Sequence, residues 1–268
     1  MISVIIPAFN DGESIGNTVA YVFANASYKR LLREVIVVDA GSGDNTVAEA
    51  EKAGARVLKT SLKGRAARSN FGARKASGSI LYFLPAASLP PSNFIGEIAK
   101  AHSKGFACGT FSLKYNSSHW LLKGVAWVTN RYSNWLQLCD QSLFVTKELF
   151  DKSGGFRVDH LVMSHQEMIK RMKRYSDFVV LKDTILSSPK KFIRSGFIKT
   201  GVLQGIVYIM HKMGYSQKQM VMLYHRFLHW DTGATGNARA MRRNRRMRQK
   251  ELITTHVSPS LKVPGTAA

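Results

Sequence analysis

The chain begins with MISVIIPAFND (residues 1–11), and EVIVVDAGSGDNT follows at residues 34–46. Within them, Ile2–Ala8 and Glu34–Asp39 are apolar runs rich in β-branched residues, which is typical of strands covered on both faces. Ser14–Ala24, between the two runs, has a helical pattern and a serine suited to the N-cap. This order of strand, helix and strand predicts a βαβ unit.

The same alternation continues toward residue 90. The expected elements are a helix capped by Asn45 and Thr46 and ending at Ala53, a strand over Ala55–Thr60, a helix over Arg65–Ala76 and a strand over Ser79–Leu84. Helices of this length between strands predict an α/β fold with a mostly parallel central sheet flanked by helices. In such a sheet ligands bind outside the carboxyl ends of the strands, here Ala8–Asp11, Asp39–Asp44 and Pro85–Ser88.

Beyond Pro90 the pattern is less regular. Further expected elements are Pro91–Lys104 (helix), Phe106–Tyr115 (strand), Trp120–Leu138 (amphipathic), Gln141–Val145 (strand), Met163–Arg174 (helix) and Phe178–Leu186 (strand). Ile193–Met213 and Ser216–His229 are amphipathic segments that mix large apolar with basic residues. We therefore expect a main domain over 1–189, a C-terminal amphipathic helical extension over 190–230 and a disordered basic tail over 231–268.

The net charge calls for a polyanionic partner. Thirty-nine Lys and Arg residues against 17 Asp and Glu give the 268-residue chain a formal net charge of +22. Apolar residues make up 45% of the chain, enough for a core, so a wholly disordered basic protein is excluded. Nucleic acid, an anionic membrane and a phosphorylated substrate are the candidate partners that this charge suggests.

Residue counts and missing motifs exclude several other classes. The longest nearly uninterrupted apolar stretch, Val202–Met210, is too short to span a bilayer as a helix. No signal peptide is readable before the first strand, so we expect a cytoplasmic protein. Cys108 and Cys139 cannot form a disulfide framework or a four-ligand zinc site. No Walker lysine motif is present, and the turn at Gly41–Gly43 lacks the third glycine of a dinucleotide fingerprint.

Two features at the expected strand ends suggest nucleotide chemistry. Asp39 ends a strand, so its carboxylate either caps the turn that follows or accepts hydrogen bonds from a base N–H or a ribose hydroxyl. Arg65 and Arg68 lie in the first turn of a predicted helix, where the helix dipole disfavours cations. A bound phosphate removes that conflict, and we favour it over a solvated basic turn.

Six segments in order resemble family 2 glycosyltransferases of the GT-A fold. They are ISVIIPAFND, EVIVVDAGSGDNT, GRAARSNFGARKASGSILYFLPAAS, CDQSLFVTKELFDKSGGF, MSHQEMIKRMKR and a closing segment that runs from SPKKF to MVMLYHRF. Over Met1–Phe227 the chain is most similar to the bacterial subgroup labelled arsenosugar-biosynthesis-type glycosyltransferases. The resemblance implies a nucleotide-diphosphate-sugar donor, usually a UDP-sugar, an acceptor hydroxyl, and Mg²⁺ or Mn²⁺ as the cofactor.

The resemblance also assigns roles to individual residues. It implies that the base and ribose are held by Pro7, Phe9, Asn10 and Asp11, that Asp39 reads the base above the turn of Gly41 and Ser42, and that Arg65 and Asn70 lie near the diphosphate. Asp140 and Gln141 match a polar pair of positions that faces the acceptor.

Two positions depart from the family pattern. After the fourth strand the chain reads PAAS, with Ala87 where the family has its metal-binding aspartate, and the uncharged Ser88 is a poor substitute ligand. In the helix beginning at Met163, Ser164 and His165 replace an acidic pair that includes the family's general base, while Glu167 is retained. His165 is either a substitute base or a surface histidine in a site that has lost its function.

The C-terminal third favours a membrane surface as the polyanion. From Lys190 to Ala268 there are 15 Lys and Arg and two acidic residues, a net charge of +13. Seven of the basic residues lie within Arg239–Lys250, and at about 1 kcal/mol each near an anionic surface they form a substantial anchor. The two amphipathic segments either cover the sheet domain or form an interfacial platform.

Three functions follow. The first is a glycosyltransferase, peripheral on the inner face of the cytoplasmic membrane, that transfers the sugar by an inverting single displacement to a lipid-linked or small hydroxyl compound. In it Arg65, Arg68 or basic C-terminal groups meet the charge of the leaving diphosphate in place of a metal. The alternative is a catalytically degenerate domain that acts as a binding or scaffold protein. Nucleic-acid binding through the basic tail lacks a recognised motif and interleaved aromatic residues.

Overall fold

The computed structural model describes residues 1–26, 30–131 and 141–228. Contacts between residues divide the chain into Met1–Trp230 and Asp231–Ala268, and every described residue belongs to the first unit. Asp140 and the basic segment Arg239–Lys250 lie outside the described residues. The roles expected for them from the sequence therefore stay predictions.

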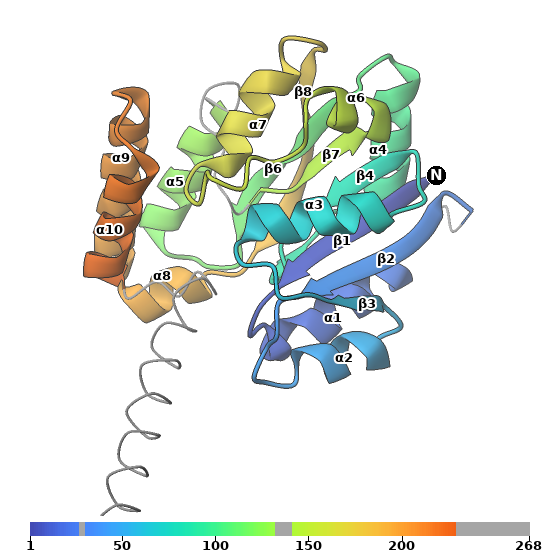
Figure 1. The fold of residues 1–268 in the computed structure, drawn as a ribbon, viewed down its shortest axis with the longest axis horizontal. Helices are drawn as coiled ribbons and strands as arrows, with labels where there is room; N and C mark the ends of the chain where they lie inside the picture. Colours follow the sequence, from blue (N-terminus) through green and yellow to red (C-terminus); the bar gives the residue numbers. More distant parts are fainter. Residues whose placement is uncertain (27–29, 132–140, 229–268) are drawn as a thin grey trace, which may run out of the picture. The chain divides into compact units, whose positions relative to one another are not determined.

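Within the described residues, eight strands form one central sheet (Figure 1). They are β1 (Ile2–Ala8), β2 (Leu32–Asp39), β3 (Arg56–Lys59), β4 (Ile80–Phe83), β5 (Ser88–Leu89), β6 (Cys108–Tyr115), β7 (Leu143–Thr146) and β8 (Phe178–Ser187). Their order in the sheet is β3-β2-β1-β4-β7-β6-β8-β5. β1 is parallel to β2 and β4, β2 to β3, and β6 to β8, whereas β7 is antiparallel to β4 and β6, and β5 to β8. The predicted α/β fold with a mostly parallel sheet is confirmed.

Most of the helices lie close to their expected positions, whereas α6 (Lys147–Lys152) was not predicted from the sequence. The helices are α1 (Gly12–Ala24), α2 (Thr46–Lys52), α3 (Arg65–Lys75), α4 (Phe94–Ser103), α5 (Trp120–Arg131), α6 (Lys147–Lys152), α7 (Ser164–Met172), α8 (Lys190–Ser195), α9 (Phe197–Lys212) and α10 (Gln217–Leu228). The amphipathic segment Ile193–Met213 is not continuous, because Gly196 has a φ of 85° and separates α8 from α9.

Two helix starts differ from the sequence prediction. α1 begins two residues before Ser14, whose hydroxyl donates to the backbone oxygen of Asp11 (3.3 Å) instead of capping the helix. At α2, Asn45 makes no side-chain cap, and the carboxylate of Asp44 accepts from the backbone N–H of Thr46 (3.0 Å). A carboxylate at a helix N-terminus is also favoured by the helix dipole, so Asp44 prevails over the neutral amide.

The first strand is covered on both faces, as its apolar run predicts. All seven residues of β1 are buried. Val4 and Ile6 belong to a cluster with side chains of α1 and α4, while Ile5 belongs to a second cluster with side chains of α3 and α7. α3 therefore lies directly on the sheet, across β1 in Figure 1.

Gly72 lets α3 approach the sheet closely. A Cβ atom at this position would lie 2.6 Å from Cγ2 of Ile5 and 2.9 Å from Cγ2 of Val38, closer than packed carbon atoms allow. The absent side chain thus sets the depth of α3 on β1 and β2. It also places the N-terminus of α3, with Arg65 and Arg68, beside the carboxyl ends of these strands.

The two C-terminal helices are attached to the segment that precedes α7. α9 and α10 share a small apolar cluster with that segment, made of Val162, Met163, Leu203, Val207, Met220 and Tyr224. At the start of α8, Nζ of Lys190 lies 2.7 Å from the carboxylate of Glu13 in α1. In the described part of the chain, no helix combines the length and apolarity needed to cross a membrane.

Candidate functional site

The loops that follow β1 and β2 are joined by hydrogen bonds at the carboxyl edge of the sheet. The backbone N–H of Asn10, which has a φ of 55°, donates to Oγ of Ser42 (2.9 Å), and Oδ1 of Asn10 accepts from the N–H of Gly43 (2.9 Å). The N–H of Asp11 donates to Oγ1 of Thr46 (2.8 Å). The sheet edge thus brings together the residues predicted to hold the base and ribose.

Asp39 caps the turn that follows β2. Its side chain is buried, with 2% exposure, and Oδ2 accepts from the backbone N–H groups of Gly41 (2.9 Å) and Ser42 (3.0 Å). The hydroxyl of Ser42 donates to Oδ1. This is the turn-capping role that the sequence left open beside base recognition. A carboxylate has about four lone-pair sites, so capping leaves capacity for a further donor, and the base contact stays a prediction.

Arg68 is a buried cation between the two loops. Its exposure is 7%, and its guanidinium lies 5.9 Å from the centre of the Phe9 ring. Burial and then the charge of Arg65 lower the pKa of Arg68 to about 10, while the carboxylates of Asp11 and Asp39 oppose this shift. Within the described residues, Nε and Nη1 of Arg68 have no hydrogen-bond partner. Unsatisfied buried donors are costly, so this guanidinium is suited to an incoming anion.

Asp11 shares this environment. Burial raises the pKa of its carboxyl, and the backbone N–H of Phe9, donating to Oδ2 at 2.9 Å, and the charge of Arg68 act in the opposite direction. Pro7 lies within β1 opposite Val38, so it contributes to the buried strand end below the loop. Asp11 and Arg68 therefore place a carboxylate and a guanidinium near each other at this edge of the sheet.

Asn70 joins α3 to a distant turn. Its Nδ2 donates to the backbone oxygen of Phe156 (2.7 Å), and its Oδ1 accepts from the N–H of Phe156 (2.9 Å). Both ends of the carboxamide are thus engaged in holding the chain that leads to α7. Asn70 therefore positions the frame of the site, and its contact with a diphosphate stays a prediction.

The residues at the expected metal position do not fit a hard divalent cation. Ala87 offers no side-chain oxygen, and its backbone oxygen accepts from the N–H of Ser188 (3.0 Å). Ser88 has 1% exposure, and its hydroxyl donates to that of Ser187 (3.2 Å). Across the described ranges no group of three or more His, Cys, Asp and Glu side chains is arranged to hold a metal ion.

His165 is buried in the first turn of α7, with 3% exposure, so the surface-histidine interpretation is wrong. Its ring packs against Phe156, with centroids 5.2 Å apart. Burial, and then the charge of Arg65, lower the pKa of His165 to about 3. The imidazole is therefore neutral at physiological pH, and without a ligand it is a weak proton acceptor.

Glu167 is part of the frame that holds α7. Its carboxylate forms a two-pronged ion pair with Arg171, with Nε–Oε1 and Nη2–Oε2 distances of 2.7 Å. Arg171 also donates to the backbone oxygens of Gly155 (2.6 Å) and Ser153.

Gln141, one of the two residues predicted to face the acceptor, is fully buried just before β7.

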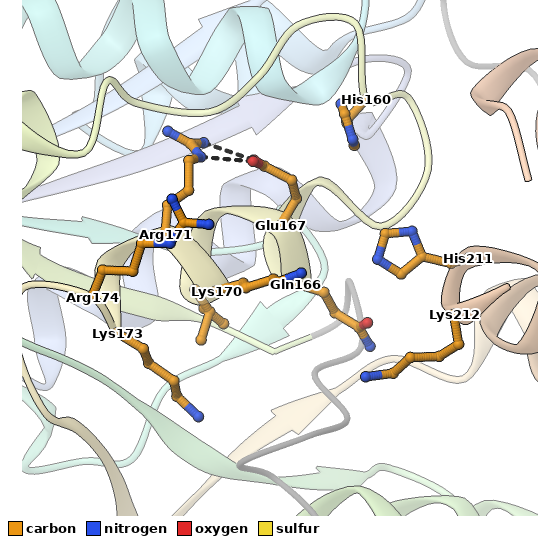
Figure 2. Close-up of a pocket in the computed structure, with 10 residues that line it drawn as sticks. His160, Gln166, Glu167, Lys170, Arg171, Lys173, Arg174, His211 and Lys212 are labelled. Carbon is orange, nitrogen blue, oxygen red and sulfur yellow. Dashed lines mark hydrogen bonds and ion pairs between the residues drawn. The ribbon is translucent and has the colours of Figure 1, made fainter. Parts of the chain in front are cut away.

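A basic cavity of 520 Å³ lies between α7 and the end of α9, and sequence reasoning missed it (Figure 2). Its lining residues are His160, Gln166, Glu167, Ile169, Lys170, Arg171, Lys173, Arg174, His211 and Lys212. The basic residues of MSHQEMIKRMKR were an available signal, but nothing in the sequence indicated that α9 would face them.

The comparison with protein families identifies a known domain. The model described as "Glycosyl transferase family 2" matches residues 3–160, more than half of the chain. This match covers both joined loops, α3 and the PAAS segment, but ends before α7. No curated protein sequence gave a match.

Solved structures share the fold at low sequence identity. The mannosyltransferase PcManGT from Pyrobaculum calidifontis, in complex with GDP-Man and Mn²⁺, matches with a TM-score of 0.62 and 17% identity, over 87% of this chain and 69% of the other. TarS 1–349 from S. aureus, solved also with UDP and with UDP-GlcNAc, matches with a TM-score of 0.58 and 16% identity, over 85% and 70%.

A third example is glucosyl-3-phosphoglycerate synthase from Mycobacterium tuberculosis, in complex with Mn²⁺, UDP and its product. It matches with a TM-score of 0.54 and 17% identity, over 80% of each chain. Against a longer TarS structure the chain covers 42% of the other molecule. At these identities the likeness establishes the GT-A fold alone, and it does not resolve the arsenosugar-type subgroup.

Proposed function

This chain belongs to glycosyltransferase family 2, and we propose that it transfers a sugar from a nucleotide-diphosphate-sugar, of the UDP-sugar class, to a hydroxyl-bearing acceptor. The observation that carries the proposal is the buried guanidinium of Arg68, whose Nε and Nη1 lack partners within the described residues at the carboxyl edge of the sheet. Three similar structures contain UDP, UDP-GlcNAc or GDP-Man, which supports the donor class.

The donor is proposed to lie over the two joined loops. Asp39 accepts from the base, and the loop of Phe9 and Asn10 holds the ribose. The diphosphate lies at the start of α3, where Arg65 and Arg68 supply positive charge and free helix N–H groups add to it. A diphosphate at this position would satisfy the two guanidinium donors that are buried without partners in the described chain, which offsets the cost of burying the cation.

We propose that donor binding does not depend on a metal. Ala87 and Ser88 supply no suitable ligand, and a fixed guanidinium can stabilise the charge that develops on the leaving diphosphate. The competing hypothesis is metal-dependent binding, because the complexes of PcManGT and of glucosyl-3-phosphoglycerate synthase contain Mn²⁺. A chelator separates the two possibilities: transfer from a UDP-sugar by the purified chain should persist in EDTA.

The reaction proposed is a single displacement with inversion. The acceptor oxygen attacks the anomeric carbon, the bond from that carbon to the diphosphate oxygen breaks, and the hydroxyl proton passes to His165. A pKa of about 3 makes the imidazole a poor base in the absence of ligand. Because the charge of Arg65 is one cause of the low value, a diphosphate bound to Arg65 would raise the pKa of His165 and make it a better base.

We further propose that the chain works at a membrane surface. α5 and α9 lie side by side and enclose an apolar hollow of 340 Å³. Trp120 of α5 and Ile198 of α9 are 73% and 70% exposed, and Lys123 and Lys199 are exposed on the same helices. Apolar and basic side chains on one pair of helices suit an anionic interface, where a lipid-linked acceptor would be found.

Vesicle sedimentation tests the membrane proposal. Ile198→Asp should weaken binding to anionic vesicles, because it places a carboxylate on the interfacial face. Val158 is also a largely exposed apolar residue but lies off these helices, so Val158→Asp is the matched control. Equal binding by the two variants would argue against α9 as the membrane-facing helix.

The second candidate function is a scaffold that binds a nucleotide-sugar without turning it over. The low pKa of His165 and the alanine at position 87, whose side chain cannot bind a cation, favour it. The two candidates differ in one measurement, which is product formation with a panel of UDP-sugars and hydroxyl acceptors. Turnover with any donor excludes the scaffold, whereas nucleotide binding with no turnover across the panel excludes the enzyme.

A further inference from the structure

The basic cavity between α7 and α9 has a surplus of positive charge. Of its ten lining residues only Glu167 is acidic, and its carboxylate is already paired with Arg171 at 2.7 Å. The remaining cations of the lining are Lys170, Lys173, Arg174 and Lys212. Among the described residues that line the cavity, no acidic side chain besides Glu167 is present.

Two of the cations are supported by aromatic rings. Nζ of Lys173 lies 5.3 Å from the ring centre of Phe178, and Nζ of Lys212 lies 5.6 Å from that of Tyr208. Such contacts attract the ammonium group to the face of the ring, so the two rings help to hold these lysines in the cavity lining. Figure 2 shows Gln166 and Lys212, from α7 and α9, extending into the same space.

The two histidines of the cavity are surrounded by the same charges. His160 and His211 both line the cavity and are both partly buried. Burial lowers the pKa of His211, and the charges of His160, Lys212 and Lys170 lower it further, with only Glu167 opposing them. A bound anion would relieve this crowding of cations.

We propose that this cavity binds the phosphate group of a phosphorylated acceptor. A volume of 520 Å³ holds a phosphate together with part of the molecule that carries it. Lysine and arginine from two helices, with an amide from Gln166, are the donors that phosphate oxygens accept from. The ligand class is a phosphate ester or diphosphate ester, carried either by a free sugar or by a lipid.

The position of α7 connects this cavity to the proposed reaction. His165 lies in the first turn of α7 beside Arg65, and the next residue, Gln166, lines the cavity. A phosphate held here would therefore orient the acceptor along α7, with its hydroxyl toward the donor. This step rests on the proposed function, but binding of phosphate to the cavity does not require turnover.

Calorimetry on the full chain tests the site, with inorganic phosphate and glucose 1-phosphate as probes. Reversing one cavity charge with Lys170→Glu should lower the affinity for both by about tenfold or more. Lys100→Glu is the control, because Lys100 is an exposed lysine of α4 outside the cavity and should leave phosphate affinity unchanged. An equal loss in both variants, or no loss in Lys170→Glu, would overturn the proposal.

Vesicles distinguish the source of the phosphate. Binding to vesicles that contain phosphatidic acid is compared with binding to vesicles of equal charge that contain phosphatidylserine. If the acceptor is lipid-borne, the phosphatidic acid vesicles bind more tightly, and Lys170→Glu removes the difference. Equal binding to the two vesicles with tight binding of glucose 1-phosphate assigns a free sugar phosphate. Equal vesicle binding with no affinity for either soluble probe rejects the cavity as a phosphate site.

UDP affinity, measured on the same proteins, keeps the two proposals separate. If the wild-type chain does not bind UDP, the proposed donor site is rejected, whereas the proposed phosphate site in the cavity is not. Phosphate binding that depends on Lys170 would then stand alone. Conversely, UDP binding with no Lys170-dependent phosphate binding would retain the family function and reject this inference.

Discussion

The two cationic regions of this protein are built differently. Arg68 is 7% exposed and lies near enough to Asp11 and Asp39 for their charges to act on its pKa, but its Nε and Nη1 have no hydrogen-bond partner among the described residues. The lysines of the cavity between α7 and α9 are exposed, and they outnumber the single acidic residue, Glu167, among the described residues of the lining. The first region can act through desolvated, directed hydrogen bonds, whereas the second depends on summed charge that salt screens.

The largest effect is expected from Arg68→Met, which keeps much of the side-chain volume and removes the charge. Loss of a buried donor pair to a diphosphate should weaken UDP binding by about 3 kcal/mol, more than a hundredfold. Arg74→Met, at the exposed end of the same helix, should leave UDP affinity unchanged. Calorimetric titration with UDP measures both.

The stability of the Arg68→Met variant shows whether Arg68 serves ligand binding or the fold. Since two guanidinium donors of Arg68 are buried without partners in the described chain, Arg68→Met should unfold at an equal or higher denaturant concentration. A marked loss of stability would mean that Arg68 is a structural cation, and the weakened UDP binding would then be a secondary effect.

The second expected effect is on stability at low pH. Folding lowers the pKa of His165 from its ordinary 6.5 to about 3. Below pH 6.5 the unfolded chain binds a proton at this residue and the folded chain does not, so the free energy of unfolding falls as the pH falls from 6.5 toward 3. Between neutral pH and about pH 5 the loss should be about 2 kcal/mol. Urea unfolding of the wild type and of His165→Gln at both pH values measures it, and the variant should lack this part of the decline. Parallel curves would mean that His165 titrates normally.

A third prediction concerns the packing of α3, which should affect the region around Arg68 but not the cavity between α7 and α9. Gly72→Ala should destabilise the protein by about 1–2 kcal/mol, since the overpacking cost exceeds the gain in helix propensity. By displacing α3 it should weaken UDP binding while leaving phosphate binding at the cavity intact. Gly205 lies in α9 with open space around its Cβ position, so Gly205→Ala should be neutral or slightly stabilising. Thermal unfolding and the two titrations check this.

The smallest effect concerns ionic strength. Raising the salt concentration from about 0.05 M to about 0.5 M shortens the range of electrostatic interactions, so phosphate affinity should fall several-fold. UDP affinity should change less, because Arg68 is buried and the salt ions of the solvent cannot surround it. A larger effect of salt on UDP affinity than on phosphate affinity would mean that the donor site, and not the cavity, depends on exposed charge.

The sequence predicted the fold better than the site. The apolar runs of β1 and β2 gave the buried parallel strands, and the strand ends pointed to Asn10, Asp11 and Asp39, which the structure brings together. Arg68 was recognised as a cation near the site, but its burial could not be read from helical spacing, because α3 is deeply seated only where Gly72 meets the sheet.

Long-range contacts account for what the sequence did not predict. Asn70 pairs with Phe156, 86 residues away, and the cavity needs α9 to face α7. His165 was interpreted as either a base or a surface residue, yet packing against Phe156 buries it. Local pattern carries no information on such pairings.

The proposed donor site uses Arg68 in place of a metal ion. Its most direct test is calorimetric titration of the chain with UDP in EDTA and in Mn²⁺, with Ala87→Asp as the companion variant. We predict that the wild type binds UDP with the same affinity in both solutions and that only Ala87→Asp gains affinity from Mn²⁺. A wild-type chain that binds UDP only when Mn²⁺ is present would contradict the account.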